Sequence, residues 1–321
     1  MKKRTKVKIF FIFVLFLQPN YFEVRLIDKQ IKRTDMKTKG MVAWIALIAM
    51  IMGGFTTPLQ AENIEGNENL ITKDIQIDDY TAIQIGHIHQ SGGSFKSLFA
   101  FIMSGGNSSN SPKVYYKQGK ETTLTVTTDE NIFPVLTFHV KGNELQIQTK
   151  EGVQISPSKL VIETSSKDLN KLSIGGGTDF YLQSALDIAS LDAYVSGGGN
   201  MEIKEPAHIK SASFSISGGG DLDVTQLTSE EVYVKVSGGG DANVAGKTQK
   251  AEMKVSGGGD LNAQDLQADH VICNVSGGGD ATVYAISQLD AHASGGGDIR
   301  YKGNPKTDTS CSGGGDIHHI N

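Results

Sequence analysis

A glycine triplet that recurs along the C-terminal half of the chain constrains the fold more than any other feature of the sequence. Its first glycine stands at Gly175, Gly197, Gly218, Gly238, Gly257, Gly277, Gly295 and Gly313, at steps of 22, 21, 20, 19, 20, 18 and 18 residues. Ser precedes seven of the eight triplets, and Asp directly follows six of them. A motif that returns at such nearly constant steps is typical of a solenoid, in which each repeat forms one coil.

Apolar residues flank the triplets with a period of two. Two positions before the first glycine stand Val195, Ile216, Val236, Val255, Val275, Ala293 and Cys311, and four positions before it stand Ala193, Phe214, Val234, Met253, Cys273, Ala291 and Thr309. Mostly polar residues lie between them, and apolar residues resume after the triplet, as at Leu222 and Val224. The alternation indicates strands with one buried face on both sides of a corner. It predicts an all-β, parallel, right-handed β-helix with coils of roughly 20 residues; an antiparallel sandwich, the main rival, would not place the same triplet once per repeat.

The glycines are expected to form the corners of the coils. Glycine accepts a positive φ and a close backbone approach without steric cost, and neighbouring strands lie only about 4.8 Å apart. The first glycines of four central triplets are therefore predicted to be structural corner residues: Gly218, Gly238, Gly257 and Gly277. The middle glycine is expected to be equally crowded, so that Gly239→Val should destabilise the fold far more than Lys254→Ala on the outer face.

The residue after each triplet is expected to form a column along the outside of the stack. These residues are Asn200, Asp221, Asp241, Asp260, Asp280, Asp298 and Asp316. Their carboxylates can accept hydrogen bonds from backbone amides at the corner, or they can collect divalent cations such as calcium. Gly218–Val224 partly resembles the calcium-binding nonapeptide of β-roll proteins, but it recurs at about twice that interval. Turn chemistry is the simpler interpretation, and no other cofactor is expected.

The N-terminal residues 1–61 carry an export signal in their pattern. Residues 36–61 have the basic, apolar and small-residue segments of a signal peptide, which predicts cleavage after Ala61 and a product that starts at Glu62. Residues 1–35 are interpreted as an upstream extension of the reading frame. A two-part leader, or an anchor made from the second apolar stretch, is the alternative. No stable membrane span is expected after cleavage, because this stretch is shorter than the ~20 residues that a span needs.

Charge and side-chain chemistry exclude several functions. Residues 1–61 carry 11 Lys and Arg and 3 Asp and Glu, and the whole chain has a net charge of −5, which leaves −13 for residues 62–321. Such an acidic product repels phosphate backbones, so nucleic acid is not an expected partner. The sequence holds no phosphate loop, no nucleophile elbow and no His-Glu-x-x-His motif. No catalytic residues are therefore predicted.

Histidine and cysteine provide the remaining candidates for chemistry. His87 with His89, or His318 with His319, could bind a metal, although exposed residues of a loop and a tail are the simpler interpretation. Cys273 and Cys311 both occupy inward positions about two coils apart. That separation exceeds the ~7 Å between Cα atoms that a disulfide allows, so two buried free thiols are expected.

The segment between the signal and the triplets also predicts strands. Residues 71–165 alternate or are β-branched, and Gly142-Asn143 is a good hairpin turn. This part is expected to be an irregular β cap on one end of the solenoid, because an open stack exposes unpaired backbone groups. Residues 87–112 interrupt the strand pattern with glycines and an apolar run, which indicates an inserted loop. Residues 62–321 are nevertheless expected to form one domain.

Several segments together resemble the head-GIN-domain putative auto-transporter adhesin family of Gram-negative bacteria. They are the repeated Ser-Gly-Gly-Gly-Asp units, Val114–Gly119, Gly142–Ile147 and Tyr301–Lys306, within a likeness that runs from about Ile71 to Asn321. The resemblance implies an exported β-helical protein without catalytic machinery, located in the periplasm, on the outer surface or outside the cell. The unbroken glycine triplets depart from the family's usual alternation of Gly with Ser.

The sequence therefore favours a non-catalytic adhesin or binding module that presents repetitive β faces to glycan, matrix or envelope components. One alternative is a polysaccharide-acting β-helix enzyme, a lyase or a hydrolase, which would need paired carboxylates or a basic residue in a groove. Another alternative is a calcium-binding structural protein of the β-roll type. Near-identical outward positions on successive coils favour the binding module, because no coil builds a specialised cleft.

Overall fold

The computed structural model describes residues 11–14, 24–27, 62–86 and 111–321 of the chain, which divides into two compact units, Met1–Leu59 and Gln60–Asn321. In the first unit, β1 (Phe11–Val14) pairs antiparallel with β2 (Val24–Ile27). The signal peptide expected at residues 36–61 lies outside the described residues. Within the described part of the chain, no helix is long and apolar enough to cross a membrane.

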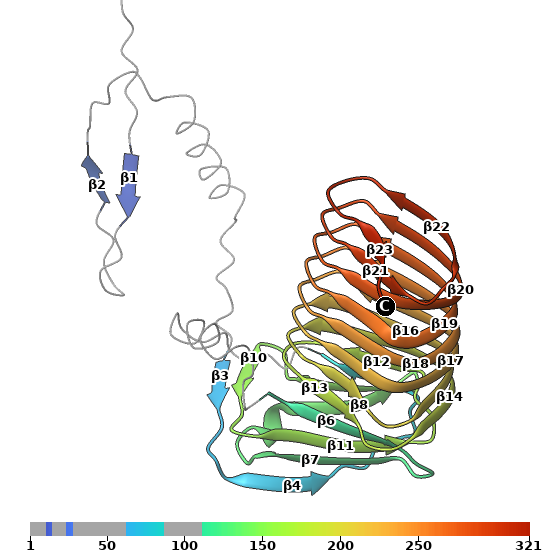
Figure 1. Cartoon of the computed structure of the whole chain (residues 1–321). Coiled ribbons are helices and arrows are strands. Elements are labelled where there is room, and N and C mark those ends of the chain that lie inside the picture. Colours follow the sequence, from blue (N-terminus) through green and yellow to red (C-terminus); the bar gives the residue numbers. More distant parts are fainter. Residues whose placement is uncertain (1–10, 15–23, 28–61, 87–110) are drawn as a thin grey trace, which may run out of the picture. The chain divides into compact units, whose positions relative to one another are not determined.

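The second unit is a parallel β-solenoid, as the sequence predicted (Figure 1). Its coils are built from β12 (Lys171–Ile174), β13 (Asp179–Leu182), β14 (Leu186–Gly197), β15 (Met201–Ile203), β16 (Ala207–Gly218), β17 (Leu222–Val236), β18 (Ala242–Val255), β19 (Leu261–Val275), β20 (Ala281–Ala293), β21 (Ile299–Lys302), β22 (Lys306–Cys311) and β23 (Ile317–His319). Each coil pairs in parallel with the coil before it and the coil after it, so the backbone is hydrogen-bonded along the whole stack.

The register between coils is the one that the glycine alignment predicted. Val195 lies beside Ile216, which lies beside Val236, and the same column continues through Val255 and Val275. These five side chains are at most 2 % exposed. The alternation of buried and exposed residues on the two sides of the corner follows from this register, because successive side chains of a strand point to opposite faces.

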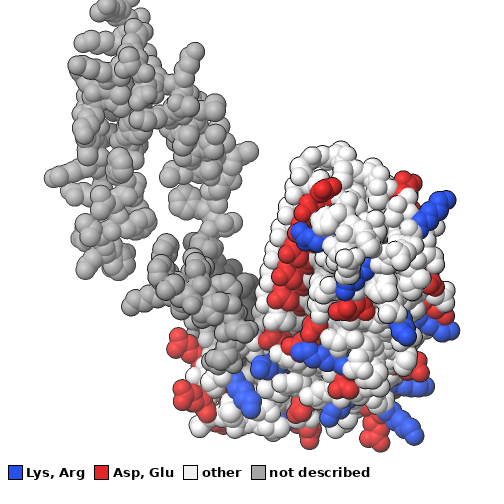
Figure 2. Space-filling view, viewed as in Figure 1, with Lys and Arg blue, Asp and Glu red and all other residues white. Residues whose placement is uncertain are grey.

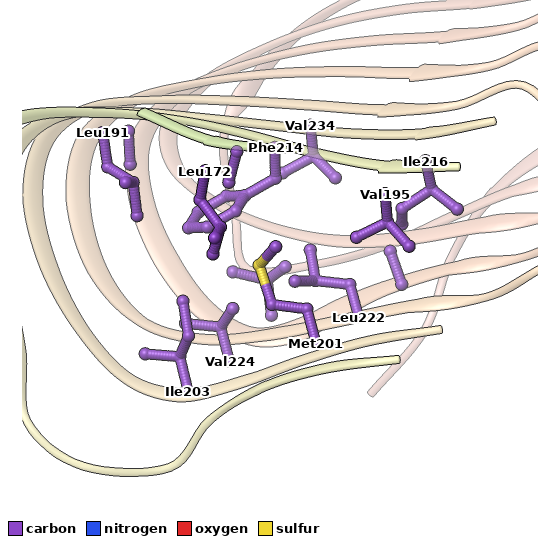
Figure 3. Close-up of a cluster of buried hydrophobic side chains, with 14 of the residues drawn as sticks. Leu172, Leu191, Val195, Met201, Ile203, Phe214, Ile216, Leu222, Val224 and Val234 are labelled. Atoms are coloured by element: carbon purple, nitrogen blue, oxygen red, sulfur yellow. The ribbon is translucent and has the colours of Figure 1, made fainter. Parts of the chain in front are cut away.

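Apolar side chains from the two faces of each coil meet in the interior (Figure 3). One column runs from Leu172 through Ala193, Phe214, Val234, Met253, Cys273 and Ala291. Small and large side chains lie next to each other along part of this column, as Ala193 lies beside Phe214 and Val234 beside Met253. A small side chain beside a large one keeps the interior close-packed.

The corners require glycine at the first and third positions of the triplet. A Cβ atom on Gly238 would lie 2.0 Å from the carbonyl oxygen of Gly218, and one on Gly240 would lie 2.0 Å from that of Gly220. The expectation for Gly239 is wrong: a Cβ there meets nothing within 4 Å, and its φ is not positive. The middle glycine points away from the stack, whereas its neighbours face the corner of the preceding coil.

An N-terminal β cap covers the first coil. It consists of β3 (Glu62–Glu65), β4 (Leu70–Asp74), β5 (Ala82–Ile85), β6 (Lys113–Gln118), β7 (Thr123–Asp129), a short 3₁₀ turn (Phe133–Val135), β8 (Leu136–Lys141), β9 (Glu144–Thr149), β10 (Val153–Ser156) and β11 (Leu160–Ser166). Antiparallel pairs β4–β7, β7–β11 and β8–β9 occur here together with the parallel pairs β3–β10, β5–β9 and β6–β11. Gly142 and Asn143 have φ values of 59° and 64° and join β8 to β9, which confirms the hairpin turn.

The chain between β5 and β6 takes the place of a glycine corner. β5 pairs with β12 and β6 pairs with β13, and β12 and β13 are the strands on either side of Gly175–Thr178. The inserted loop expected at residues 87–112 therefore connects β5 to β6. The equivalent strands of the next coil, β12 and β13, are connected by a corner of four residues. Residues 87–110 themselves lie outside the described part of the chain.

The last coil corrects one expectation. Cys273 is fully buried, as predicted, but Cys311 is exposed. Cys311 lies beside Ala293 in an inward column, but β22 pairs with β20 and no further described coil covers its other side. Inward orientation buries a side chain only when coils lie both above and below it, so Cys311 is exposed at the end of the stack.

Candidate functional site

The residues after the glycine triplets form a hydrogen-bonded column, which we call the aspartate ladder. In each case the backbone amide of the residue in one coil donates to the side-chain Oδ1 of the residue in the preceding coil. The bonds are Asp221 to Asn200 (3.0 Å), Asp241 to Asp221 (2.9 Å), Asp260 to Asp241 (2.8 Å), Asp280 to Asp260 (2.7 Å), Asp298 to Asp280 (2.8 Å) and Asp316 to Asp298 (2.9 Å). The carboxylates from Asp221 to Asp298 thus accept backbone amides from the next coil rather than from their own corner, whereas Asp316 accepts the amide of Ile317 at 2.8 Å.

The ladder supplies hydrogen-bond acceptors at the point in each corner where the backbone amides stop donating to the preceding coil and begin to donate to the following coil. Gly239 and Gly240 both donate to the carbonyl oxygen of Gly218, at 2.8 and 3.0 Å. The amide of Ala242 donates to the carbonyl oxygen of Asp260, at 2.9 Å. Between these bonds, the amide of Asp241 finds its acceptor in the side chain of Asp221. An acceptor at this position therefore completes the hydrogen bonding of each corner.

Negative charge accumulates along the ladder, and Figure 2 shows acidic side chains in a continuous red band along the stack. Unit charges about 5 Å apart repel by roughly 0.8 kcal/mol even in water. Arg300 relieves part of this repulsion, because its guanidinium bonds to Oδ2 of Asp280 at 2.8 Å and of Asp298 at 3.3 Å. The amide of Asp298, followed by Arg300, holds the pKa of Asp280 below its usual value.

Sequence reasoning missed the first member of the ladder. Asp179 follows Thr178 rather than the triplet itself. Its Oδ1 nevertheless accepts the backbone amide and the side-chain amide of Asn200, at 3.0 and 3.2 Å. Its Oδ2 accepts the hydroxyl of Ser111 at 2.5 Å. The sequence did show an acidic residue at the end of the first corner. It was overlooked because Asp179 stands two positions after its triplet, whereas the other ladder residues stand one position after theirs.

The ladder does not gather its carboxylates into a cage. Within the described residues, no group of three or more His, Cys, Asp or Glu side chains could hold a metal ion. Adjacent carboxylates lie in single file along the stack, and one oxygen of each is bonded to an amide of the next coil. The second oxygens of Asp221, Asp241 and Asp260 remain available to solvent ions.

We expect calcium to have no effect on the stability of the ladder. In Asp241→Asn/Asp260→Asn the acceptors remain and repulsion falls, so the melting temperature should stay equal or rise slightly. Asp241→Ala should cost about 1 kcal/mol, because the amide of Asp260 loses its partner. Thermal melts at low ionic strength, with and without millimolar calcium, measure both effects. A calcium-dependent rise that disappears in the double Asn variant would instead establish a cation site.

The histidine candidates do not converge. His318 and His319 are neighbours on β23 and point to opposite faces of the strand. The ring of His319 lies against Tyr301 and is hydrogen-bonded through Nε2 to the carbonyl oxygen of Gly303 at 2.9 Å. His87 and His89 lie outside the described residues. Burial raises the pKa of Cys273 to about 12, which makes this thiol unreactive when the protein is folded.

Two open hollows lie on the outer surface near the cap. The larger, of about 540 Å³, is lined by Gln118, Gly119, Lys120, Lys167 and Ala185. The other, of about 470 Å³, contains Tyr115 and Glu163. The ring of Tyr115 stacks on that of Tyr181, with centroids 5.1 Å apart and planes inclined by 25°. The alternation in Val114–Lys117 could have indicated an outward Tyr115, but nothing in the sequence showed its neighbours.

Comparison with known proteins yields one family and several solved structures. The family model described as putative auto-transporter adhesin, head GIN domain, matches residues 107–305. A crystal structure of a putative lipid binding protein from Parabacteroides distasonis ATCC 8503 is 27 % identical, with a TM-score of 0.71. Putative adhesins from Parabacteroides merdae ATCC 43184 and from P. distasonis are 22 % and 23 % identical, both with a TM-score of 0.69. Each alignment covers 81 % of this chain and 100 % of the other. None of the curated proteins compared with the chain matches it.

Proposed function

Because this chain belongs to the family of putative auto-transporter adhesins with a head GIN domain, we propose that it is an exported, non-catalytic binding protein. In this proposal its outer β faces bind glycan, matrix or envelope components. It acts in the periplasm, on the outer cell surface or outside the cell. The family name and the resemblance to other adhesin structures support this class of function.

The observation that carries the proposal is the alignment of outward side chains on successive coils. Tyr194, Ser215, Lys235, Lys254, Asn274 and His292 occupy one outer column in strict register. Repetition of this kind produces a long, flat surface rather than a cleft. A flat repeated surface suits a partner that is itself extended or repetitive, because many weak contacts then add up.

The polysaccharide-acting alternative lacks geometric support at the two hollows. Glycosidases place two carboxylates across the scissile bond, about 5–9.5 Å apart. Glu163 is the one carboxylate in the smaller hollow, and the larger hollow has none. The carboxylates of the aspartate ladder lie on the outside of the corners, where they accept hydrogen bonds from backbone amides. Binding without cleavage is the function that this arrangement favours.

A lipid partner would have to bind outside the coils. The side chains of two inner columns, one from Val195 to Val275 and the other from Phe214 to Ala291, are at most 3 % exposed and fill the interior. Large apolar side chains that are exposed, Leu70, Tyr194 and Ile286, lie on separate strands. Vesicle binding is therefore included in the test below as a competing outcome.

Export is proposed from the sequence of residues 36–61, whose basic start, apolar core and small residue at Ala61 match a signal peptide. The acidic product from Glu62 onward would carry a net charge of −13. Such a charge keeps an exported protein soluble and separate from anionic surfaces.

The protein should retain polysaccharides or matrix components without shortening them. A glycan array, immobilised matrix proteins and phosphatidylethanolamine–phosphatidylglycerol vesicles would be probed with the purified protein, and new reducing ends would be assayed in parallel. We expect saturable binding to glycan or matrix and no release of reducing ends. The heat-unfolded protein is the control for non-specific adhesion. Release of reducing ends would show an enzyme, and binding to vesicles alone would show a lipid-binding protein.

A further inference from the structure

The smaller hollow combines an aromatic ring with unpartnered charged groups. It lies on the outer face of β6, β7 and β11, where Lys113, Val161 and Thr127 occupy one row and Tyr115 and Glu163 occupy the next. Its volume of about 470 Å³ falls within the range of small-molecule sites. Of the two hollows near the cap, this one contains an aromatic ring and a carboxylate, whereas the other contains neither.

One face of the Tyr115 ring is covered and the other is directed toward the hollow. Tyr181 lies beside Tyr115 on β13, and the two rings stack at 5.1 Å. On the other side, Tyr115 lies beside Glu163 of β11. Because Tyr181 occupies the first face, the second face turns toward Glu163 and the hollow. Tyr115 is held in this orientation by the stack, which lowers the entropy cost of ligand binding.

The charged groups around the ring are not engaged in hydrogen bonds or ion pairs with other described residues. Within the described residues, the side chains of Glu163 and Lys159 form neither a hydrogen bond nor an ion pair. Lys113 also lines the hollow; its Nζ lies over the Tyr181 ring, 6.0 Å from the ring centroid, and within the described residues it forms neither a hydrogen bond nor an ion pair. The rim of the hollow thus offers acceptors from Glu163 and donors from Lys113 and Lys159.

We propose that this hollow is a saccharide-binding subsite, in which one pyranose unit lies against the free face of Tyr115. A pyranose has an apolar face of C–H groups and a rim of hydroxyls, so it needs an aromatic surface surrounded by donors and acceptors. Glu163 accepts from the sugar hydroxyls, and Lys113 donates to them. The inference rests on the proposed binding function and assigns it a ligand class and a place.

The test compares Tyr115→Ala with Tyr233→Ala in the full chain. Tyr233 is a matched control, because it is also half-buried on an outer face and has Lys254 Nζ 5.3 Å from its ring centroid, but it lies outside the hollow. Maltohexaose, cellohexaose, chitohexaose and hexagalacturonate are the probes. Affinity is measured by titration calorimetry, and contact with sugar C–H groups is measured by saturation-transfer NMR.

We expect at least one probe to bind, with affinity that falls about tenfold or more in Tyr115→Ala, the loss of roughly 1.4 kcal/mol of binding free energy. Tyr115→Phe should bind normally, Glu163→Gln should bind more weakly, and Tyr233→Ala should match the native protein. Circular dichroism verifies the fold of each variant, and the isosteric Glu163→Gln keeps the test valid if Tyr115→Ala unfolds.

Two results would contradict the saccharide subsite without contradicting the proposed binding function. If a probe binds equally to the native protein, Tyr115→Ala and Glu163→Gln, the hollow is not the site, although glycan binding stands. If no probe binds while the array and matrix experiments show another partner, the saccharide subsite is wrong and the adhesin function remains.

Discussion

Gly238→Ala should lower the melting temperature of the protein by roughly 6–12 °C, whereas Gly239→Ala should leave it unchanged or raise it slightly. A Cβ atom on residue 238 would lie 2.0 Å from a backbone oxygen that belongs to the preceding coil, so the whole corner must move. Overpacking against rigid backbone costs about 3 kcal/mol, and each kcal/mol corresponds to about 2–4 °C for a domain of this size.

The control in this experiment is the neighbouring glycine of the same triplet. Nothing lies within 4 Å of a Cβ on Gly239, and alanine there reduces the conformational freedom of the unfolded chain. Thermal melts followed by circular dichroism compare the two variants. Equal losses of stability would mean that crowding between coils does not explain the glycines.

Native protein should contain one fast thiol and one thiol that is at least about a thousandfold slower. Cys311 is exposed, whereas Cys273 is fully buried and its pKa is raised by burial from 9.0 to about 12. A rise of three pKa units lowers the thiolate fraction about a thousandfold near pH 8, and the thiolate is the reactive form. Reaction with dithionitrobenzoate at pH 8 should therefore release one equivalent of product rapidly.

Cys311→Ser isolates the slow thiol. This variant should show almost no reaction when folded and one equivalent in guanidinium chloride. Two fast thiols in the native protein would contradict the packing of the inner column that contains Cys273. Two slow thiols would show that another part of the chain or a second copy covers the last coil.

Much of the solenoid could be predicted because one coil constrains the next. Val195, Ile216 and Val236 share an inward position in the alignment and lie side by side in the structure. Period-two alternation gives the buried face, and the triplet gives the corner, so the parallel register follows from the spacing. The cap was predicted less fully, because its antiparallel pairs, such as β4 with β7, join segments with no shared motif.

The predicted corner chemistry was right in kind and incomplete in detail. Asp221 does bond to a backbone amide, but the amide belongs to Asp241 in the next coil, a contact that local turn preferences do not reveal. Gly239 was placed among the crowded glycines because the sequence does not show which of three glycines faces the neighbouring corner. Cys311 was predicted to be buried because the alignment gives orientation but not the end of the stack.

The neighbourhood of Tyr115 could not be predicted at all. Its stacking partner, Tyr181, is distant along the chain, and Glu163 comes from a third strand. The alternation of buried and exposed residues along each strand places these three side chains on the outer face. Only the folded cap brings the three strands together. Sites made of long-range neighbours require the three-dimensional register, whereas repeated columns do not.

The hydrogen bond from Asp241 to the side chain of Asp221 is repeated from Asp260 to Asp241, and again from Asp280 to Asp260. A coil can therefore be duplicated or deleted as a unit, because the joint created has the same bonds as the joint replaced. Each duplicated coil would move the far end of the protein about 4.8 Å away from the cap. Slippage during replication of a short repeated DNA segment would thus adjust the reach of the protein in equal increments, while the cap and its hollow stay unchanged.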